Sequence, residues 1–211
     1  MVTLPRTGTF SAFAMIVDIN GFGKLAFSDF QGIAQFTGDL LIGGIYRVEK
    51  NGGQVVGFMG DAFYAILHDV DSVFNCCSEI AHDMAGLYED FASLQGSFPF
   101  SPKNIGLKIG VEYGLLDTGR IYSRFLDETI IFTGKPVTYA ARILAAGKGN
   151  RCLIGPEAYG QGMKKWIKGR PRYIKGKEGE MGYKYFSLNL DHIWTNSIDN
   201  PPVVVVSEES R

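Results

Sequence analysis

The sequence predicts one α+β domain with a mostly antiparallel central sheet and helices packed on it. Three observations predict this class: an apolar strand opens the chain, helical and hairpin patterns follow it, and a second hairpin closes the pattern. The 211 residues suffice for one sizeable domain but not comfortably for two. We place the domain in residues 1–190 and a tail in 191–211, where the valines after Pro201-Pro202 could add an edge strand.

Each element of the first half follows from a local pattern. A dense apolar run that ends in a carboxylate indicates a buried strand, and apolar residues at helical spacing indicate helices. A Gly-Asp pair between two apolar runs indicates a hairpin. In chain order we expect a strand over 11–19 with Asp18 at its end, two helices or one kinked helix over 24–50 interrupted near Gly38 and Gly43, a C-cap at Asn51-Gly52-Gly53, and a hairpin of 54–59 and 62–67 joined at Gly60-Asp61.

The second half continues with a long helix from Asp71 to about Leu94, with Asp71 or Ser72 near its N-cap. The remaining elements that we expect are strands at 105–113 and 119–123, a helix over 136–146, a strand at 152–154, a short helix that Pro156 opens, and a hairpin of 172–175 and 183–188. This order of elements favours a ferredoxin-like sandwich with additional elements.

Composition and charge argue against several classes of protein. The 21 Lys and Arg residues balance 22 Asp and Glu residues, which argues against nucleic-acid binding through bulk positive charge. No run approaches the roughly 20 apolar residues that a membrane-spanning helix needs, and no signal-peptide pattern opens the chain. The three cysteines lack metal-ligand spacing and indicate buried thiols in a reducing compartment. We therefore expect a cytoplasmic protein.

Two carboxylates are the first candidate site. Asp18 ends the first strand, and Asp61 lies at the tip of the next hairpin. If that hairpin pairs beside the first strand, both carboxylates face the same end of the sheet, where divalent cations would find oxygen ligands. Taken alone, Asp61 could equally be an ordinary turn residue. Backbone N–H groups of the loop Gly21-Phe22-Gly23 could approach a phosphate, although a simple turn explains this loop as well.

Five motifs in order resemble the catalytic domain of class III adenylyl and guanylyl cyclases. They span residues 13–188, nearly the whole chain. The motifs are Met15-Ile16-Val17-Asp18-Ile19-Asn20-Gly21-Phe22, Gly52-Gly53-Gln54-Val55-Val56 running to Gly60-Asp61-Ala62-Phe63, Leu107-Lys108-Ile109-Gly110-Val111-Glu112-Tyr113-Gly114, Phe132-Thr133-Gly134-Lys135-Pro136-Val137-Thr138-Tyr139-Ala140-Ala141-Arg142, and Ile174-Lys175-Gly176-Lys177.

The resemblance implies a role for each motif. It implies two divalent cations, Mn²⁺ or Mg²⁺, and a nucleoside triphosphate substrate at a site shared between two domains, which for a single domain favours a homodimer. By this resemblance, the metal ions would be bound by Asp18, Asp61 and the Ile19 carbonyl. The phosphates would accept hydrogen bonds from the N–H groups of Gly21, Phe22 and Gly23. Arg142 would contact the α-phosphate, Lys175 the terminal phosphates and Thr138 the ribose. As alternatives, Arg142 could cap its own helix and Lys175 could be solvated.

The sequence departs from the family where the base is read. Gly57 and Ile131 stand where adenylyl and guanylyl cyclases carry side chains that hydrogen-bond a purine, and Thr138 stands in place of asparagine. The chain is similar in size and in its lack of a sensor domain to the stand-alone bacterial pyrimidine cyclases of antiphage (Pycsar) defence. We therefore expect a pyrimidine cyclase that uses UTP over CTP, with Tyr46 preferred over Tyr64 and Tyr139 to fill the base pocket.

Such an enzyme would act in antiviral signalling through an effector that senses the cyclic nucleotide. Two other interpretations stay open: a divergent adenylyl cyclase, and a catalytically silent module for dimerisation or nucleotide binding. A diguanylate cyclase is poorly supported, because the Gly60-Asp61-Ala62-Phe63 turn lacks the paired glycines and the extra carboxylate of that family.

Overall fold

An eight-stranded sheet lies at the centre of the computed structural model, which describes residues 7–27, 32–95, 105–121, 129–177, 180–190 and 204–205. Its strands are β1 (Gly8–Asn20), β2 (Gln54–Met59), β3 (Ala62–Leu67), β4 (Gly106–Ile121), β5 (Thr129–Thr133), β6 (Arg151–Ile154), β8 (Arg172–Ile174) and β9 (Tyr183–Asn189). Their order is β2-β3-β1-β4-β6-β9-β8, and β5 pairs with β4 outside this path. Every pairing is antiparallel except that of β4 with β6. The predicted α+β fold is confirmed.

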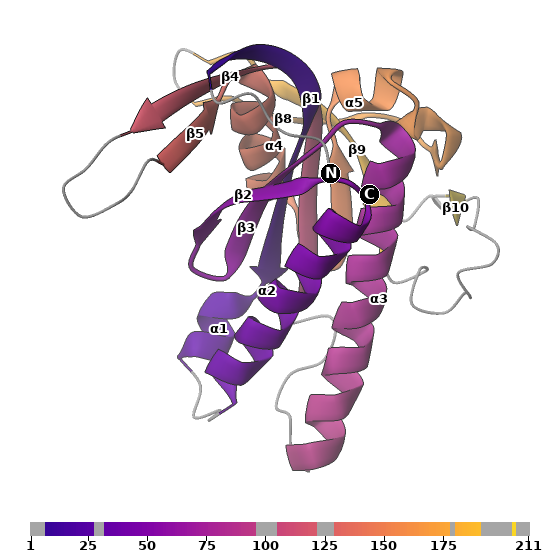
Figure 1. The fold of residues 1–211 in the computed structure, drawn as a ribbon. Coiled ribbons are helices and arrows are strands. Elements are labelled where there is room, and N and C mark those ends of the chain that lie inside the picture. The colour runs from indigo at the N-terminus through magenta and orange to yellow at the C-terminus, as the bar shows by residue number, and fades with distance from the viewer. Residues whose placement is uncertain are drawn as a thin grey trace.

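Helices cover both faces of this sheet. They are α1 (Phe22–Ala26), α2 (Ile33–Lys50), α3 (Val70–Gln95), α4 (Lys135–Ala146) and α5 (Pro156–Gly160), with a 3-10 turn η1 (Met163–Lys165). The long helices α2 and α3 run side by side in front of the sheet in the view of Figure 1. On the other face, α4 packs against β1 and β4. Different helices therefore shield the two faces. Both faces need cover because successive side chains of the apolar strand β1 point to opposite faces of the sheet.

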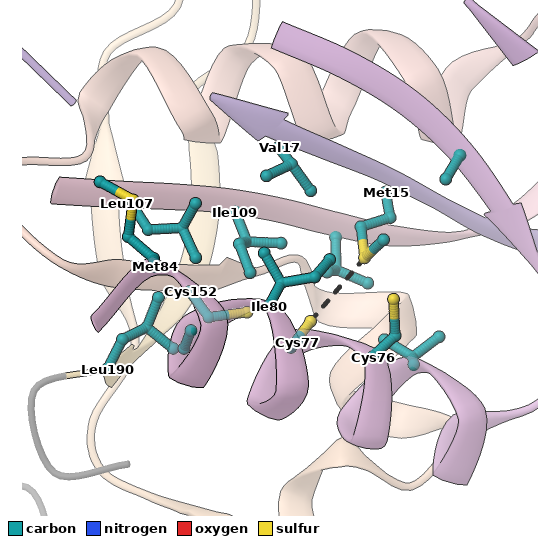
Figure 2. Packing of buried hydrophobic residues seen from close by; sticks show 14 of the residues in the cluster. Met15, Val17, Cys76, Cys77, Ile80, Met84, Leu107, Ile109, Cys152 and Leu190 are labelled. Carbon is teal, nitrogen blue, oxygen red and sulfur yellow. Dashed lines mark hydrogen bonds between the residues drawn. The ribbon is translucent and has the colours of Figure 1, made fainter. Parts of the chain in front are cut away.

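The main core lies between the sheet and α3. Met15 and Val17 of β1 point toward this helix, while Ile16 between them packs with Ala140 and Leu144 of α4. Figure 2 shows the sulfur atoms of the core, with Cys77 Sγ lying 3.8 Å from Met15 Sδ. All three cysteines are buried and free, as predicted.

In the first half of the chain, two helices follow β1 as expected, but α2 continues through Gly38 and Gly43 without interruption. Burial of one face of α2 against the core outweighs the low helix propensity of these glycines. The hairpin of β2 and β3 forms as predicted. The N-cap of α3 is Asp69, whose carboxylate accepts hydrogen bonds from the N–H and the hydroxyl of Ser72, and not Asp71 or Ser72.

In the second half, the predicted strands 105–113 and 119–123 are one strand, β4, within the described residues, which end at 121 there. Thirteen consecutive residues of β1 pair with β4, from Gly8 opposite Thr118 to Asn20 opposite Gly106, and this long ladder carries β4 through Gly114. β5 was not predicted at all. The helices at Pro136 and Pro156 and the hairpin of β8 and β9 agree with the sequence.

The tail forms one short pairing, in which β10 (Val204–Val205) lies parallel to β7 (Ile167–Lys168). This pairing is the edge strand that the valines after Pro201-Pro202 were expected to be able to add. The rest of 191–211 lies outside the described residues. Over the part of the chain that the structure describes, no helix is long and apolar enough to cross a membrane.

Candidate active site

The sheet brings the two predicted carboxylates together at one of its ends. Val17 of β1 lies opposite Phe63 of β3, so Asp18 follows that pair while Asp61 lies in the turn just before β3. Gly60 closes this turn with a φ of 62°, a left-handed conformation that glycine adopts without strain. The Asp61 carboxylate consequently lies beside that of Asp18 and feels its charge.

Asp61 is in an unfavourable electrostatic environment. Its pKa is raised from 3.8 to about 6, first because burial removes water from the carboxylate and second because Asp18 carries a like charge. The N–H groups of Asp61 and Ile19 donate to it and oppose this rise. Its Oδ2 atom is buried and has no hydrogen-bond partner within the described residues. A bound cation would relieve both the repulsion and the unpaired oxygen.

Magnesium or manganese ions fit this pair, because they prefer oxygen ligands and keep positions open for water or substrate oxygens. Ile19 could contribute only its backbone, since its side chain is buried in the core. Within the described ranges, no three His, Cys, Asp or Glu side chains gather in a group. Further ligands for a cation would therefore be backbone carbonyls, water and substrate.

The structure adds Lys108 to this end of the sheet. The register of β1 and β4 places Lys108 opposite Asp18, and its Nζ atom lies 2.6 Å from Oδ2 of Asp18. The two side chains are only 16% and 21% exposed, so the ammonium offsets one of the two carboxylates. Sequence reasoning gave Lys108 no role, although a lysine inside the apolar run 107–111 was a signal that could have found it.

The loop after β1 begins at Gly21, three residues beyond Asp18. Gly21 has a φ of 84° and precedes the five-residue helix α1. The N–H groups of Lys24 and Leu25 donate to the Gly21 carbonyl, whereas those of Phe22 and Gly23 come too early in the helix to have an intrahelical acceptor. A Cβ atom at Gly23 would meet nothing within 4 Å, so the loop has open space beside it.

A cavity of about 370 Å³ holds both positions that were predicted to face the base. It lies among the β2–β3 hairpin, β1, β5 and the start of α4, and Gly57 and Ile131 are in its wall. The other lining residues are Ala14, Met15, Ile16, Val56, Phe58, Met59, Tyr64, Ala65, Ile66, Phe132 and Val137. Among the described residues, this lining is therefore apolar apart from backbone groups and one hydroxyl, that of Tyr64.

The three candidate tyrosines lie in different surroundings. Tyr64 lines the cavity. Tyr46 is 60% exposed on α2, with the Arg47 guanidinium 5.5 Å from its ring centroid, and is outside the lining. The Tyr139 hydroxyl donates to the carbonyl of Lys184 and accepts from its N–H, each at 2.9 Å. Of the three, Tyr64 is therefore the one that lines this cavity on a single chain, and the assignment of Tyr46 to the base pocket stays a prediction.

A second cleft of about 250 Å³ brings Arg142 and Lys175 together between α4 and the β8–β9 hairpin. Lys177 also lines it, which gives three cations on one concave surface. Thr138 is exposed one helical turn before Arg142, on the same side of α4. Such a surface suits a polyanion such as a triphosphate.

Glu180, which sequence reasoning did not single out, supplies the one carboxylate that the described residues bring to this cleft. Its Oε1 atom lies 2.6 Å from Nη2 of Arg142, and its Oε2 atom accepts a hydrogen bond from the Tyr183 hydroxyl at 3.1 Å. Arg142 is thus oriented toward the hairpin by an ion pair. The contact is to a single nitrogen of the guanidinium, whose planar fork carries further donors.

The candidate residues form separate groups on this chain. Among the described residues, neither the base cavity nor the Arg142 cleft includes Asp18 or Asp61 in its lining. One group, at the strand ends, consists of Asp18, Asp61 and Lys108. The other lines the cleft of α4 and shares no residue with the first.

Comparison with known proteins identifies the fold. No protein-family model and no curated protein matches the sequence. Among solved structures, the adenylyl cyclase CyaB from P. aeruginosa aligns with a TM-score of 0.71 and 18% identity over 87% of this chain and 96% of that one. The guanylyl cyclase Cya2 aligns with a TM-score of 0.73 and 15% identity over 87% and 93% of the two chains.

A third solved structure is the guanylate cyclase domain of RhGC from Catenaria anguillulae in complex with GTP. It aligns with a TM-score of 0.65 and 17% identity over 85% of this chain and 97% of that domain. At these identities the likeness shows that the chain has the fold of adenylyl and guanylyl cyclase catalytic domains.

Proposed function

We propose that this chain is a nucleotidyl cyclase, which converts a nucleoside triphosphate into the 3′,5′-cyclic monophosphate and pyrophosphate. The observation that carries the proposal is the pair of carboxylates Asp18 and Asp61, adjacent at the strand ends and with one buried oxygen unpaired. The fold supports it, because the solved structures that it resembles are adenylyl and guanylyl cyclase domains.

In this reaction the ribose 3′-oxygen forms a bond to the α-phosphorus, and the bond from that phosphorus to the oxygen of pyrophosphate breaks. The proton of the 3′-hydroxyl leaves to solvent. Two Mn²⁺ or Mg²⁺ ions, held by Asp18, Asp61 and the Ile19 carbonyl, would lower the pKa of this hydroxyl and offset the charge of the triphosphate. The carboxylates thus fix where the attacking oxygen and the α-phosphate meet.

The remaining residues bind and orient the substrate. The N–H groups of Gly21, Phe22 and Gly23 and the ammonium of Lys108 hold phosphate oxygens beside the carboxylates. From the cleft of α4, Arg142 stabilises the charge that develops at the α-phosphate. In the same cleft, Lys175 binds the terminal phosphates and Thr138 contacts the ribose.

The enzyme works as a head-to-tail homodimer. Because the carboxylate pair and the Arg142 cleft do not share a hollow on one chain, a second copy related by a two-fold axis would bring the carboxylates of one protomer to the cleft of its partner. Two equivalent sites follow from such symmetry.

The substrate of this proposed enzyme is a pyrimidine nucleotide, UTP rather than CTP. The support is the apolar base cavity, in which neither Gly57 nor Ile131 offers the side-chain hydrogen bonds that hold a purine. The cyclic product would act as a cytoplasmic second messenger of antiviral signalling, read by a separate effector.

Two alternatives rest on the same cavity and cleft. Loss of base-reading side chains is also expected of a catalytically silent module, and the ion pair of Glu180 with Arg142 favours that alternative because it occupies the residue needed at the α-phosphate. A divergent adenylyl cyclase would use the same carboxylates and read adenine through backbone groups.

The test is to incubate the purified protein with each of the four nucleoside triphosphates and Mn²⁺ and to identify the products by mass. We expect a cyclic monophosphate and pyrophosphate, formed faster from UTP or CTP than from ATP or GTP. Asp18→Ala and Asp61→Ala should each abolish turnover while the fold and the dimer persist. A higher kcat/KM for ATP than for both pyrimidines would return the protein to the adenylyl cyclases, and no product with metal bound would support the silent module.

A further inference from the structure

The base cavity contains a polar group at a position where a base edge would need one. Gly57 of β2 lies directly opposite Tyr64 of β3 in the antiparallel register, and Ile16 of β1 lies on the other side of Tyr64. Cross-strand partners point to the same face of a sheet. The phenol ring therefore stands beside the space that a side chain at residue 57 would fill, and a Cβ atom there would meet nothing within 4 Å.

The Tyr64 hydroxyl is also poorly satisfied. The contact recorded for it is to Sδ of Met59 at 3.8 Å, a weak acceptor on a side chain that is itself 64% exposed. A phenol hydroxyl can donate to a better acceptor at little cost when one arrives. The contrast is Tyr139, whose hydroxyl is held by both backbone groups of Lys184.

The rest of the wall is suited to the flat faces of a base. Met59 and Ile131 present exposed apolar surface at the cavity. Apolar and aromatic surface stacks on any base without distinguishing one from another. Discrimination must therefore come from hydrogen bonds to the base edge, and Tyr64 carries the one side-chain hydroxyl that the described part of the chain brings to the lining.

We infer that Tyr64 is the specificity-determining residue of this site, and that its hydroxyl donates a hydrogen bond to a ring carbonyl of a pyrimidine base. The inference rests on the proposed cyclase function. Uracil presents two ring carbonyls, cytosine and guanine one each, and adenine none, so this hydrogen bond by itself discriminates against adenine. The ring of Tyr64 also occupies volume next to Gly57, which favours a one-ring base over a two-ring base in the same cavity.

The experiment compares Tyr64→Phe with the wild type and with Tyr159→Phe for all four nucleoside triphosphates. Removal of the hydroxyl leaves the base carbonyl unpaired, so we expect kcat/KM for the preferred pyrimidine to fall about tenfold to a hundredfold. The values for ATP and GTP should change less than about threefold, so the ratio between bases collapses. Tyr159→Phe is the matched control, because it removes the same atom from a ring that stacks on Phe186 and lines neither cavity, and it should leave all four values unchanged.

Equilibrium binding of the four nucleotides, measured by calorimetry on the same proteins, separates this inference from the proposed function. If the wild type turns over no nucleotide, the cyclase proposal fails, and the loss or persistence of base preference in binding still decides the role of Tyr64. An equal fall for all four nucleotides, or an unchanged ratio between them, overturns the inference. A thermal melt of each variant shows whether the fold persists, and Tyr64→Met, which keeps apolar volume without the hydroxyl, should reproduce the collapsed ratio if Tyr64→Phe does not fold.

Discussion

Asp61, a residue of the proposed metal site, opposes the stability of the metal-free fold. Its carboxylate is partly buried, lies beside the like charge of Asp18 and has an unpaired oxygen. Nothing in the core requires a charge there, since β3 is otherwise anchored by apolar residues such as Phe63. In the metal-free protein the ionised form of Asp61 is therefore a cost to folding, because the pKa is higher in the folded chain than in the unfolded one.

Asp61→Asn should abolish turnover and yet raise the melting temperature of the metal-free protein. The amide keeps the shape of the side chain and removes the repulsion, which we expect to stabilise the fold by about 1 kcal/mol, or roughly 2–4 °C. Because the pKa is about 6 in the folded chain and 3.8 in the unfolded one, the gain should be full well above pH 6 and disappear below pH 3.8, where Asp61 is protonated in both states. Thermal melts in EDTA across this range measure it.

Asp18→Asn is the matched comparison. It removes one charge from the same pair, but it also breaks the contact of Asp18 with Lys108, so its gain should be smaller. If Asp61→Asn lowers the melting temperature at every pH, the repulsion is not the dominant force on this carboxylate.

At the scale of elements, α2 contains glycines with different constraints. A Cβ atom at Gly44 would lie 2.5 Å from Cε1 of Phe63, a fully buried ring of β3. A Cβ atom at Gly38, in the same helix, would meet nothing within 4 Å. Gly44 is thus needed for close approach of helix and sheet, whereas Gly38 is a position where helix propensity alone decides.

Alanine at these two positions should have opposite effects on stability. Gly44→Ala should lower the free energy of unfolding by about 1–3 kcal/mol, because the methyl group overpacks the interface with Phe63. Gly38→Ala should raise it by about 0.5–1 kcal/mol, because alanine loses less conformational entropy in a helix. Urea denaturation of both variants gives the two values, and a stabilised Gly44→Ala would mean that the ring of Phe63 can move aside.

Elements with a strong local signal could be predicted from the sequence, and those that depend on a partner strand could not. The β2–β3 turn is encoded by Gly60 and its flanking apolar runs. By contrast, the continuity of β4 depends on its pairing with β1, and β5 exists through its pairing with β4. The same limit applies to the site: Asp18 and Asp61 are visible in the sequence, but Lys108 and Glu180 gain their roles only from strand register and hairpin packing.

At the scale of the whole molecule, the arrangement of the groups bears on how many chains build one site. The carboxylates lie at the ends of β1 and at the β2–β3 turn, while Arg142 and Lys175 lie in the cleft of α4 and the β8–β9 hairpin. If catalysis needs both groups at one substrate, each site of the proposed homodimer takes the carboxylates from one protomer and the cleft from its partner. Defects in the two groups should then complement each other.

Mixing Asp61→Ala protein with Arg142→Ala protein should therefore restore turnover, although each variant alone is nearly inactive. In a heterodimer one site unites both altered halves and the other unites both wild-type halves, so free exchange of equal amounts should recover about a quarter of the wild-type rate. The control mixes Asp61→Ala with Asp18→Ala: both changes fall on the carboxylate half, every site keeps one defect, and no activity should return. Pyrophosphate release measures the rate, and subunit exchange is followed by native mass spectrometry of one labelled partner. If subunits exchange in the first mixture and activity does not return, each chain must supply a complete site by itself. In that case every site contains one of the two defects, whichever partner the chain has.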